Sequence, residues 1–163
     1  MRIIFFRHGE AEELHPLGVD EARSLTDRGR RRTRKMLKAI DKLIPKKCRV
    51  QIWSSPLLRA VQTADVLAET YEIKTKVYSA ISNGDLDSLL DSLAQLSKDD
   101  CVFIVGHQPF LSEWLERLTG VSLPFKKSGT AALWYDPAAN DSSGQPEVEL
   151  LWYVQPHYAK QYR

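Results

Sequence analysis

Cysteine, long apolar runs and net charge are all scarce in this chain, and each shortage excludes a class of protein. The two cysteines among 163 residues, Cys48 and Cys101, show no CxxC or Cys/His spacing, which excludes a disulfide framework and a zinc ribbon. No apolar run approaches the roughly 20 residues that span a bilayer, so we expect no membrane association. A formal net charge of +2 gives no argument for a nucleic-acid partner.

The first residues, MRIIFFRHG, contain a strand-length apolar run that is followed at once by charge. They lack the small residues of a cleavage site and so do not have the pattern of a signal peptide. We therefore expect a cytoplasmic protein.

The charge is unevenly distributed along the chain. Residues 23–49 contain twelve lysines or arginines and two aspartates, a local charge of +10. Such a stretch can face an acidic partner. A solvated helix face is the simpler interpretation, and we favour it.

Apolar periodicity predicts alternating strands and helices. The expected strands cover residues 2–6, 49–53, 73–78, 101–105, 130–135 and 147–154, and the expected helices cover 26–44, 56–71, 85–97 and about 110–118. Residues 14–27 are predicted as a loop or short helix, and 136–146 as a turn-rich hairpin loop. This order predicts one α/β domain over 1–163, a three-layer sandwich with a mostly parallel central sheet, helices on both faces and an antiparallel edge.

Unusual polar residues follow three of the predicted strands. They are Arg7, His8 and Gly9 after the first strand, Ser54, Ser55 and Pro56 with Arg59 one turn later, and Gly106 and His107 after residues 101–105. In open α/β sheets, ligands bind at the carboxyl ends of the strands. We therefore expect two histidines and two arginines to converge on one site.

The chemistry of these residues is coherent for phosphate. Guanidinium groups bind phosphate oxygens, and a helix beginning near Pro56, with Ser55 as its cap, adds backbone donors. A neutral imidazole can attack phosphorus, and a second imidazole can donate to the oxygens that gain charge. Gly9 allows close approach of the backbone. No carboxylate, histidine or cysteine cluster has metal-ligand spacing, so we expect no metal or other cofactor.

Each of these residues also has a structural interpretation. His8 alone could be a hydrogen-bonded core residue, Arg59 alone a surface charge, and His107 alone a helix cap. Their coincidence at the strand ends of one sheet favours the functional interpretation. His15 and His157 lie outside this pattern and are predicted to be surface residues.

Three blocks of the sequence resemble the histidine phosphatase superfamily, whose fold is that of phosphoglycerate mutase. They are FFRHGEAE (5–12), IWSSPLLRAVQTA (52–64) and IVGHQPFLSEW (104–114), and SLTDRGRRRTRKM (24–36) is similar to a further stretch of small members. The short chain looks like the SixA-like phosphohistidine phosphatase branch. The resemblance implies that His8 is the nucleophile and that Arg7, Arg59 and His107 complete a phosphate pocket, to which we add Gly9 and Ser55 as substrate-binding residues.

The sequence departs from mutase-type members in two places. The Thr and Asn that follow RHG in those members are absent, and so is their Glu after the third strand, where this chain reads YSAISNGDLDSLL. Glu10 and Asp85 are the nearest candidate proton donors. An ester gains much from a general acid, whereas the imidazole of phosphohistidine is a better leaving group once protonated. The missing Glu therefore favours phosphohistidine as the substrate.

Three functions follow as hypotheses. The first is a phosphatase, expected to be monomeric, that removes phosphate from histidine on a protein through a covalent intermediate at His8. The second is a phosphomonoesterase for a small metabolite. The third is a non-catalytic module that binds phosphate or a phosphoprotein, which is disfavoured because both histidines and both arginines are present.

Overall fold

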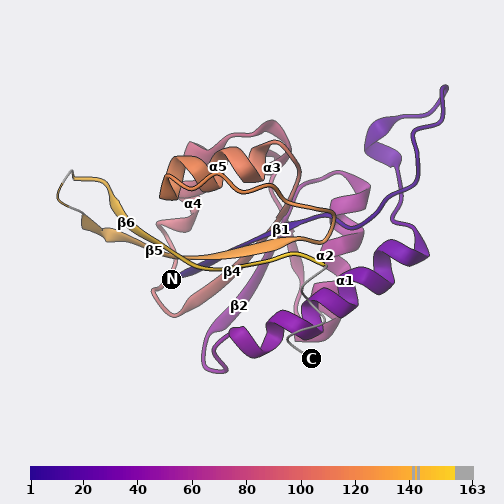
Figure 1. The fold of residues 1–163 in the computed structure, drawn as a ribbon. Coiled ribbons are helices and arrows are strands. Elements are labelled where there is room, and N and C mark those ends of the chain that lie inside the picture. Colours follow the sequence, from indigo (N-terminus) through magenta and orange to yellow (C-terminus); the bar gives the residue numbers. More distant parts are fainter. Residues whose placement is uncertain (141, 143, 157–163) are drawn as a thin grey trace.

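The computed structural model describes residues 1–140, 142 and 144–156, and these residues form a central sheet with helices on both sides (Figure 1). The strands are β1 (Arg2–Arg7), β2 (Arg49–Ser54), β3 (Thr75–Val77), β4 (Asp100–Gly106), β5 (Thr130–Asn140) and β6 (Pro146–Val154). The α-helices are α1 (Asp27–Ile40), α2 (Leu58–Tyr71), α3 (Ser79–Asn83), α4 (Leu86–Leu93) and α5 (Phe110–Thr119). Two short 3₁₀ helices, η1 (Asp20–Ala22) and η2 (Asp41–Leu43), flank α1. His157 lies outside the described residues.

The order of the strands in the sheet is β3-β2-β4-β1-β5-β6. Strands β3, β2, β4 and β1 are parallel, and β5 and β6 form an antiparallel hairpin at one edge. The predicted α/β fold with a mostly parallel sheet and an antiparallel edge is therefore confirmed. Arg7 pairs with Gly106, and Ser54 pairs with Val105. The carboxyl ends of β1, β4 and β2 thus lie level with one another.

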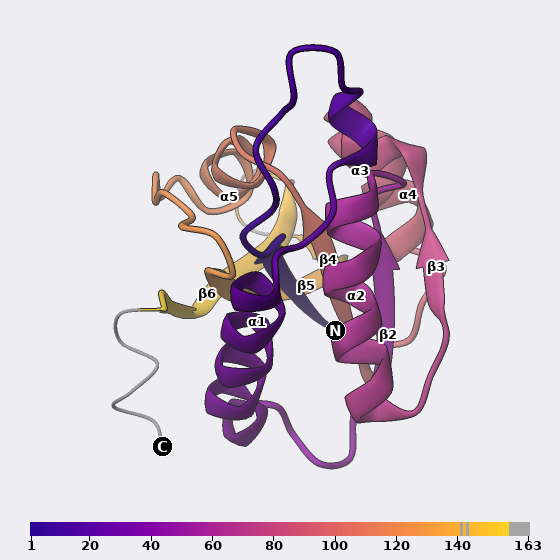
Figure 2. The same ribbon diagram turned by 90° about the vertical axis from the view of Figure 1, so that its right-hand side faces the viewer.

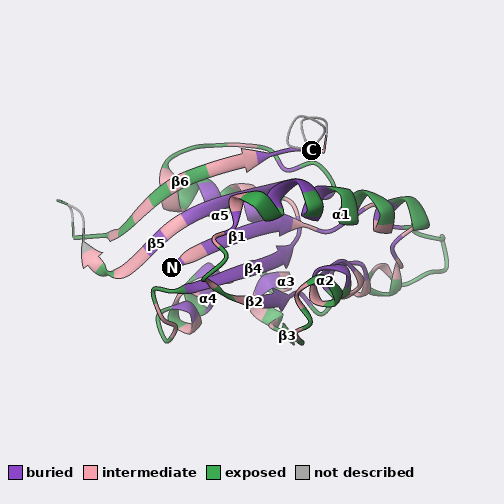
Figure 3. Ribbon diagram, turned by 90° about the horizontal axis from the view of Figure 1, so that it is seen from below, coloured by how far each residue is buried: buried purple, intermediate pink, exposed green. Residues whose placement is uncertain are grey.

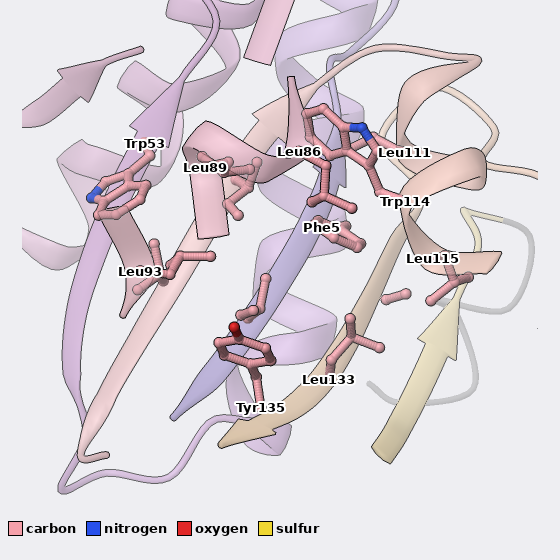
Figure 4. Close-up of a cluster of buried hydrophobic side chains, with 14 of the residues drawn as sticks. Phe5, Trp53, Leu86, Leu89, Leu93, Leu111, Trp114, Leu115, Leu133 and Tyr135 are labelled. Carbon is pink, nitrogen blue, oxygen red and sulfur yellow. The ribbon is translucent and has the colours of Figure 1, made fainter. Parts of the chain in front are cut away.

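Helices cover both faces of the sheet (Figure 2). Side chains alternate along a strand, so Ile4 and Phe6 of β1 face the helices α1 and α2, whereas Ile3 and Phe5 face α4 and α5. Figure 4 shows Phe5 in this second cluster with Trp114 of α5. Two covered faces explain why β1 and β4 are continuous apolar runs, and Figure 3 shows both strands largely buried.

Helix α1 is shorter than predicted. It begins after Thr26, whose hydroxyl accepts a hydrogen bond from the backbone N–H of Gly29. It ends at Ile40, four residues before the predicted end, because the chain tightens into η2 ahead of Pro45.

The predicted start of the second helix at Pro56 is also wrong. The hydroxyl of Ser55 accepts a hydrogen bond from the N–H of Leu57, which holds residues 55–57 in a turn. Leu57 has extended backbone angles and is the N-cap, so α2 begins at Leu58.

Four further elements differ from the prediction by more than one residue. Gly84, at φ 72°, ends a helix α3 that was not predicted and separates it from α4, which stops at Leu93 instead of residue 97. Strand β3 is limited to the three residues that pair with β2. Strand β5 continues to Asn140 through the predicted loop, because its pairing with β6 resumes after an irregularity between Asp136 and Asn140.

Within the part of the chain that the structure describes, no helix combines the length and apolar character needed to cross a membrane.

Candidate active site

The four predicted residues Arg7, His8, Arg59 and His107 come together at the carboxyl edge of the sheet. The N–H of His8 donates to the carbonyl oxygen of Gly106 at 3.0 Å, which ties the segment after β1 to the end of β4. The rings of His8 and His107 lie 5.2 Å apart between centroids. His8, Arg59 and His107 are each at most 7% exposed, and Arg7 is half-buried.

The hydrogen bonding of His8 fixes its tautomer. Its Nδ1 lies 2.7 Å from the carbonyl oxygen of Gly9, which can only accept, so Nδ1 carries the proton. The neutral ring then has an unprotonated Nε2. Burial is the largest cause that lowers the pKa of His8, to about 3, and the nearby His107 and Arg59 act in the same direction. His8 is therefore neutral at physiological pH and has a free lone pair.

The hydrogen bonding of His107 points to the opposite tautomer. Its Nε2 lies 2.7 Å from the hydroxyl oxygen of Ser55, which also accepts a hydrogen bond from the N–H of Leu57. We assign the Ser55 hydroxyl as the donor to Nε2, which places the ring proton of His107 on Nδ1. Burial, followed by the charge of Arg59, lowers the pKa of His107 to about 4.

Each arginine is anchored through its terminal nitrogens. Arg7 Nη1 donates to the carbonyl oxygen of Phe125 at 2.6 Å. Arg59 donates twice to Asp20, from Nη1 to the carbonyl oxygen at 2.9 Å and from Nη2 to the carboxylate at 3.1 Å. In each of the two arginines the buried Nε–H has no hydrogen-bond partner.

Unsatisfied buried donors are concentrated at this site. Among the described residues, four buried side-chain atoms lack a hydrogen-bond partner, and three of them are Arg7 Nε, Arg59 Nε and His107 Nδ1. Buried polar groups are nearly always paired in native proteins. Three unpaired donors beside an unprotonated imidazole nitrogen fit an anion with several oxygens.

The backbone around His8 is held from several directions. The N–H of Gly9 donates to Thr63, whose hydroxyl donates to the carbonyl oxygen of Arg59, so α2 is linked directly to the RHG segment. Ser128 has a left-handed φ of 62°, and its N–H is shared between the carbonyl oxygens of Arg7 and His8. A Cβ on Gly9 would lie 2.8 Å from Thr33 Oγ1, so only glycine fits there.

The two predicted proton donors lie in other interactions. The Glu10 carboxylate accepts a hydrogen bond from the hydroxyl of Thr26, the N-cap of α1, and forms an ion pair with Arg32 at 3.4 Å. The Asp85 carboxylate caps α4 by accepting from the backbone N–H and the hydroxyl of Ser88. These hydrogen bonds lower the pKa of Asp85, so its carboxylate is ionised at neutral pH and has no proton to donate.

Residues outside the predicted set also contribute. Thr63 follows Arg59 by one helical turn, a spacing that could have identified it. Asp20 and Ser128 lie in loops without periodicity, so no sequence signal points to them. No group of three or more histidine, cysteine or acidic side chains suited to a metal occurs in residues 1–140, 142 and 144–156.

Comparisons with known proteins place the chain in a family. Residues 3–87 match the family model of the histidine phosphatase superfamily, branch 1. An uncharacterised protein of Picosynechococcus sp. is 35% identical over 161 residues, covering 93% of this chain and 95% of that protein. The chain therefore belongs to the histidine phosphatase superfamily, as predicted, and it is a phosphatase that acts on a phosphorylated substrate.

Solved structures share the fold. The protein histidine phosphatase SixA complexed with tungstate matches with a TM-score of 0.75 at 22% identity, over 96% of this chain and 98% of that one. A mycobacterial glucosyl-3-phosphoglycerate phosphatase matches with a TM-score of 0.67 at 16% identity, over 94% and 99%. Proteins with this fold thus include a protein histidine phosphatase and a phosphatase for a small metabolite.

Proposed function

We propose that this protein removes phosphate from phosphohistidine on another protein, with His8 as the transient phosphate carrier. The observation that carries the proposal is the set of three unpaired buried donors around the unprotonated Nε2 of His8. Arg7, Arg59 and His107 would each donate to the phosphoryl oxygens, with Gly9 and Ser55 holding the two imidazoles in their tautomers.

The reaction would proceed in two displacements. The substrate imidazole is protonated by solvent on its other nitrogen. The lone pair of His8 Nε2 then forms a bond to phosphorus as the P–N bond breaks, and the substrate leaves as neutral imidazole. Water then attacks the phosphorus on His8, releasing inorganic phosphate and restoring neutral His8. The three donors stabilise the charge on the equatorial oxygens in both steps.

The choice of phosphohistidine rests on what the site offers as an acid. A poor leaving group needs a proton in the transition state. Glu10 and Asp85, the predicted donors, are bound at the starts of α1 and α4, and Asp20, which contacts Arg59, is paired with two arginines. A substrate with a good leaving group suits this arrangement, and the SixA structure that shares the fold holds an oxyanion, tungstate.

A phosphomonoesterase for a small metabolite is the second candidate. The fold shared with the mycobacterial glucosyl-3-phosphoglycerate phosphatase favours it. It requires a carboxylic acid in the site, and Asp20 is the carboxylate in contact with the site arginine.

The test is a comparison of two substrates with two proteins. Wild type and His8→Ala would each be incubated with a histidine-phosphorylated carrier protein and with an aryl phosphate. We expect rapid loss of phosphate from the carrier, slower hydrolysis of the ester, and neither with His8→Ala. Hydrolysis of the ester alone would favour the second candidate, and activity retained by His8→Ala would refute the role of His8.

A further inference from the structure

We infer that Asp20 is a positioning residue for phosphate transfer, which acts by holding the guanidinium of Arg59 in the orientation that presents its Nε–H to the substrate. This inference rests on the proposed role of Arg59 in binding the phosphoryl group. Asp20 lies 39 positions from Arg59 in the sequence and outside the four sequence blocks quoted above.

The contact between Asp20 and Arg59 has two points. The carbonyl oxygen of Asp20 accepts from Nη1 at 2.9 Å, and its carboxylate Oδ2 accepts from Nη2 at 3.1 Å. Two acceptors on the terminal nitrogens fix the plane of a rigid guanidinium fork. Nε–H is among the donors that these two bonds leave free, and it is buried and unpaired. We call this two-point contact of Asp20 with Arg59 the clamp. It determines which edge of the Arg59 guanidinium is available to an anion.

The clamp is itself held in place. The second carboxylate oxygen of Asp20 accepts from Arg23 Nε at 2.9 Å, and Arg23 also donates to the carbonyl oxygen of Glu12 at 3.2 Å. The bases of the loop are joined by a bridge between Ala11 and Leu25. The loop that follows the RHG segment thus contacts Arg59 of α2, and the two ends of this loop are joined to each other.

The charges in the site support a positioning role over an acid role. Burial opposes ionisation of Asp20, but Arg59 and Arg23 outweigh it and hold its pKa below the ordinary value. An ionised carboxylate has no proton to donate. Taken alone, a negative charge close to the site would weaken binding of an anion, so geometry and charge predict opposite effects when Asp20 is neutralised.

The experiment uses this opposition. Tungstate affinity, and kcat and KM with an aryl phosphate, would be measured for wild type, Asp20→Asn, Arg59→Gln, the double variant and Glu21→Gln. Glu21→Gln removes the same charge from the neighbouring residue and is the matched control. Thermal unfolding of each variant would show that the fold is intact.

We expect Asp20→Asn to weaken tungstate binding and to lower kcat/KM about 10–100-fold, the range seen for residues that orient a ligand-binding group. Glu21→Gln should match wild type, and Asp20→Asn should add nothing in the Arg59→Gln background, because both act through one guanidinium. Tighter tungstate binding by Asp20→Asn, or additive losses in the double variant, would overturn the inference. If Arg59→Gln itself binds tungstate like wild type, the proposed phosphate site is wrong as well.

Discussion

Acid should destabilise this protein through its two buried histidines, and the size of the effect follows from the structure. The pKa of His8 is lowered to about 3 and that of His107 to about 4 by burial, whereas a histidine in the unfolded chain titrates near 6.5. At pH values between the folded and unfolded pKa values, the two histidines bind protons in the unfolded chain but not in the folded protein. Stability therefore falls as the pH drops below about 6.5.

The loss can be estimated at pH 5, where both rings are still neutral in the folded protein. The difference of 1.5 pH units between 6.5 and 5 corresponds to about 2 kcal/mol for each ring. Both side chains are at most 7% exposed, so solvent screening reduces this figure little. Carboxylates also contribute to acid unfolding, and comparison among variants separates their contribution from that of the histidines.

The assay is urea unfolding at pH 7.5 and pH 5 for wild type, His8→Asn, His107→Asn and His15→Asn. His15 lies on the exposed loop before η1 and is the matched control. Between pH 7.5 and pH 5 the free energy of unfolding falls in every protein. We expect this fall to be about 2 kcal/mol smaller in His8→Asn and in His107→Asn than in wild type. The same loss in all four proteins would show that the two rings are not buried in the neutral form.

Three further substitutions test separate parts of the structure. Ser55→Ala should lower kcat/KM roughly tenfold, since it removes the hydrogen bond that fixes the tautomer of His107, and unchanged kinetics would contradict that assignment. Gly29→Ala should cost about 1–3 kcal/mol in urea unfolding, because a Cβ there would overlap the carbonyl oxygen of Glu10, and wild-type stability would contradict that packing. Asp85→Ala should lower the melting temperature by removing the cap of α4 while leaving kcat unchanged, and a large loss of kcat would make this carboxylate the proton donor after all.

The sequence predicts most of the sheet because the strand residues are unambiguous. The apolar run at residues 101–105 is short for a helix and is typical of a central strand, and the structure shows that strand buried throughout. The edges of the sheet are different. Strand β5 runs to Asn140 through Pro137 and two alanines, because its pairing with β6 outweighs weak local propensity. Helix α3 is only five residues long, which is too short for periodicity to reveal.

The candidate site divides in the same way. The sequence predicts that four residues converge on one site, since the carboxyl ends of parallel strands share an edge. They are Arg7, His8, Arg59 and His107. The position of Asp20 could not be predicted, because its contact with Arg59 depends on the path of an irregular loop across 39 positions. The expectation that Asp85 is near the chemistry followed from its position in sequence, whereas the structure uses its carboxylate as a helix cap.

Detection of phosphate on His8 during turnover is the decisive measurement for the proposed covalent intermediate. Wild type and His8→Ala would be mixed with a radiolabelled phosphohistidine carrier protein and quenched in alkali, in which phosphohistidine survives. The labelled peptide would then be identified. We expect transient label on the peptide that contains His8 in wild type and none in His8→Ala. Turnover by wild type with no label on that peptide at any time, or with label on another residue, would contradict that intermediate.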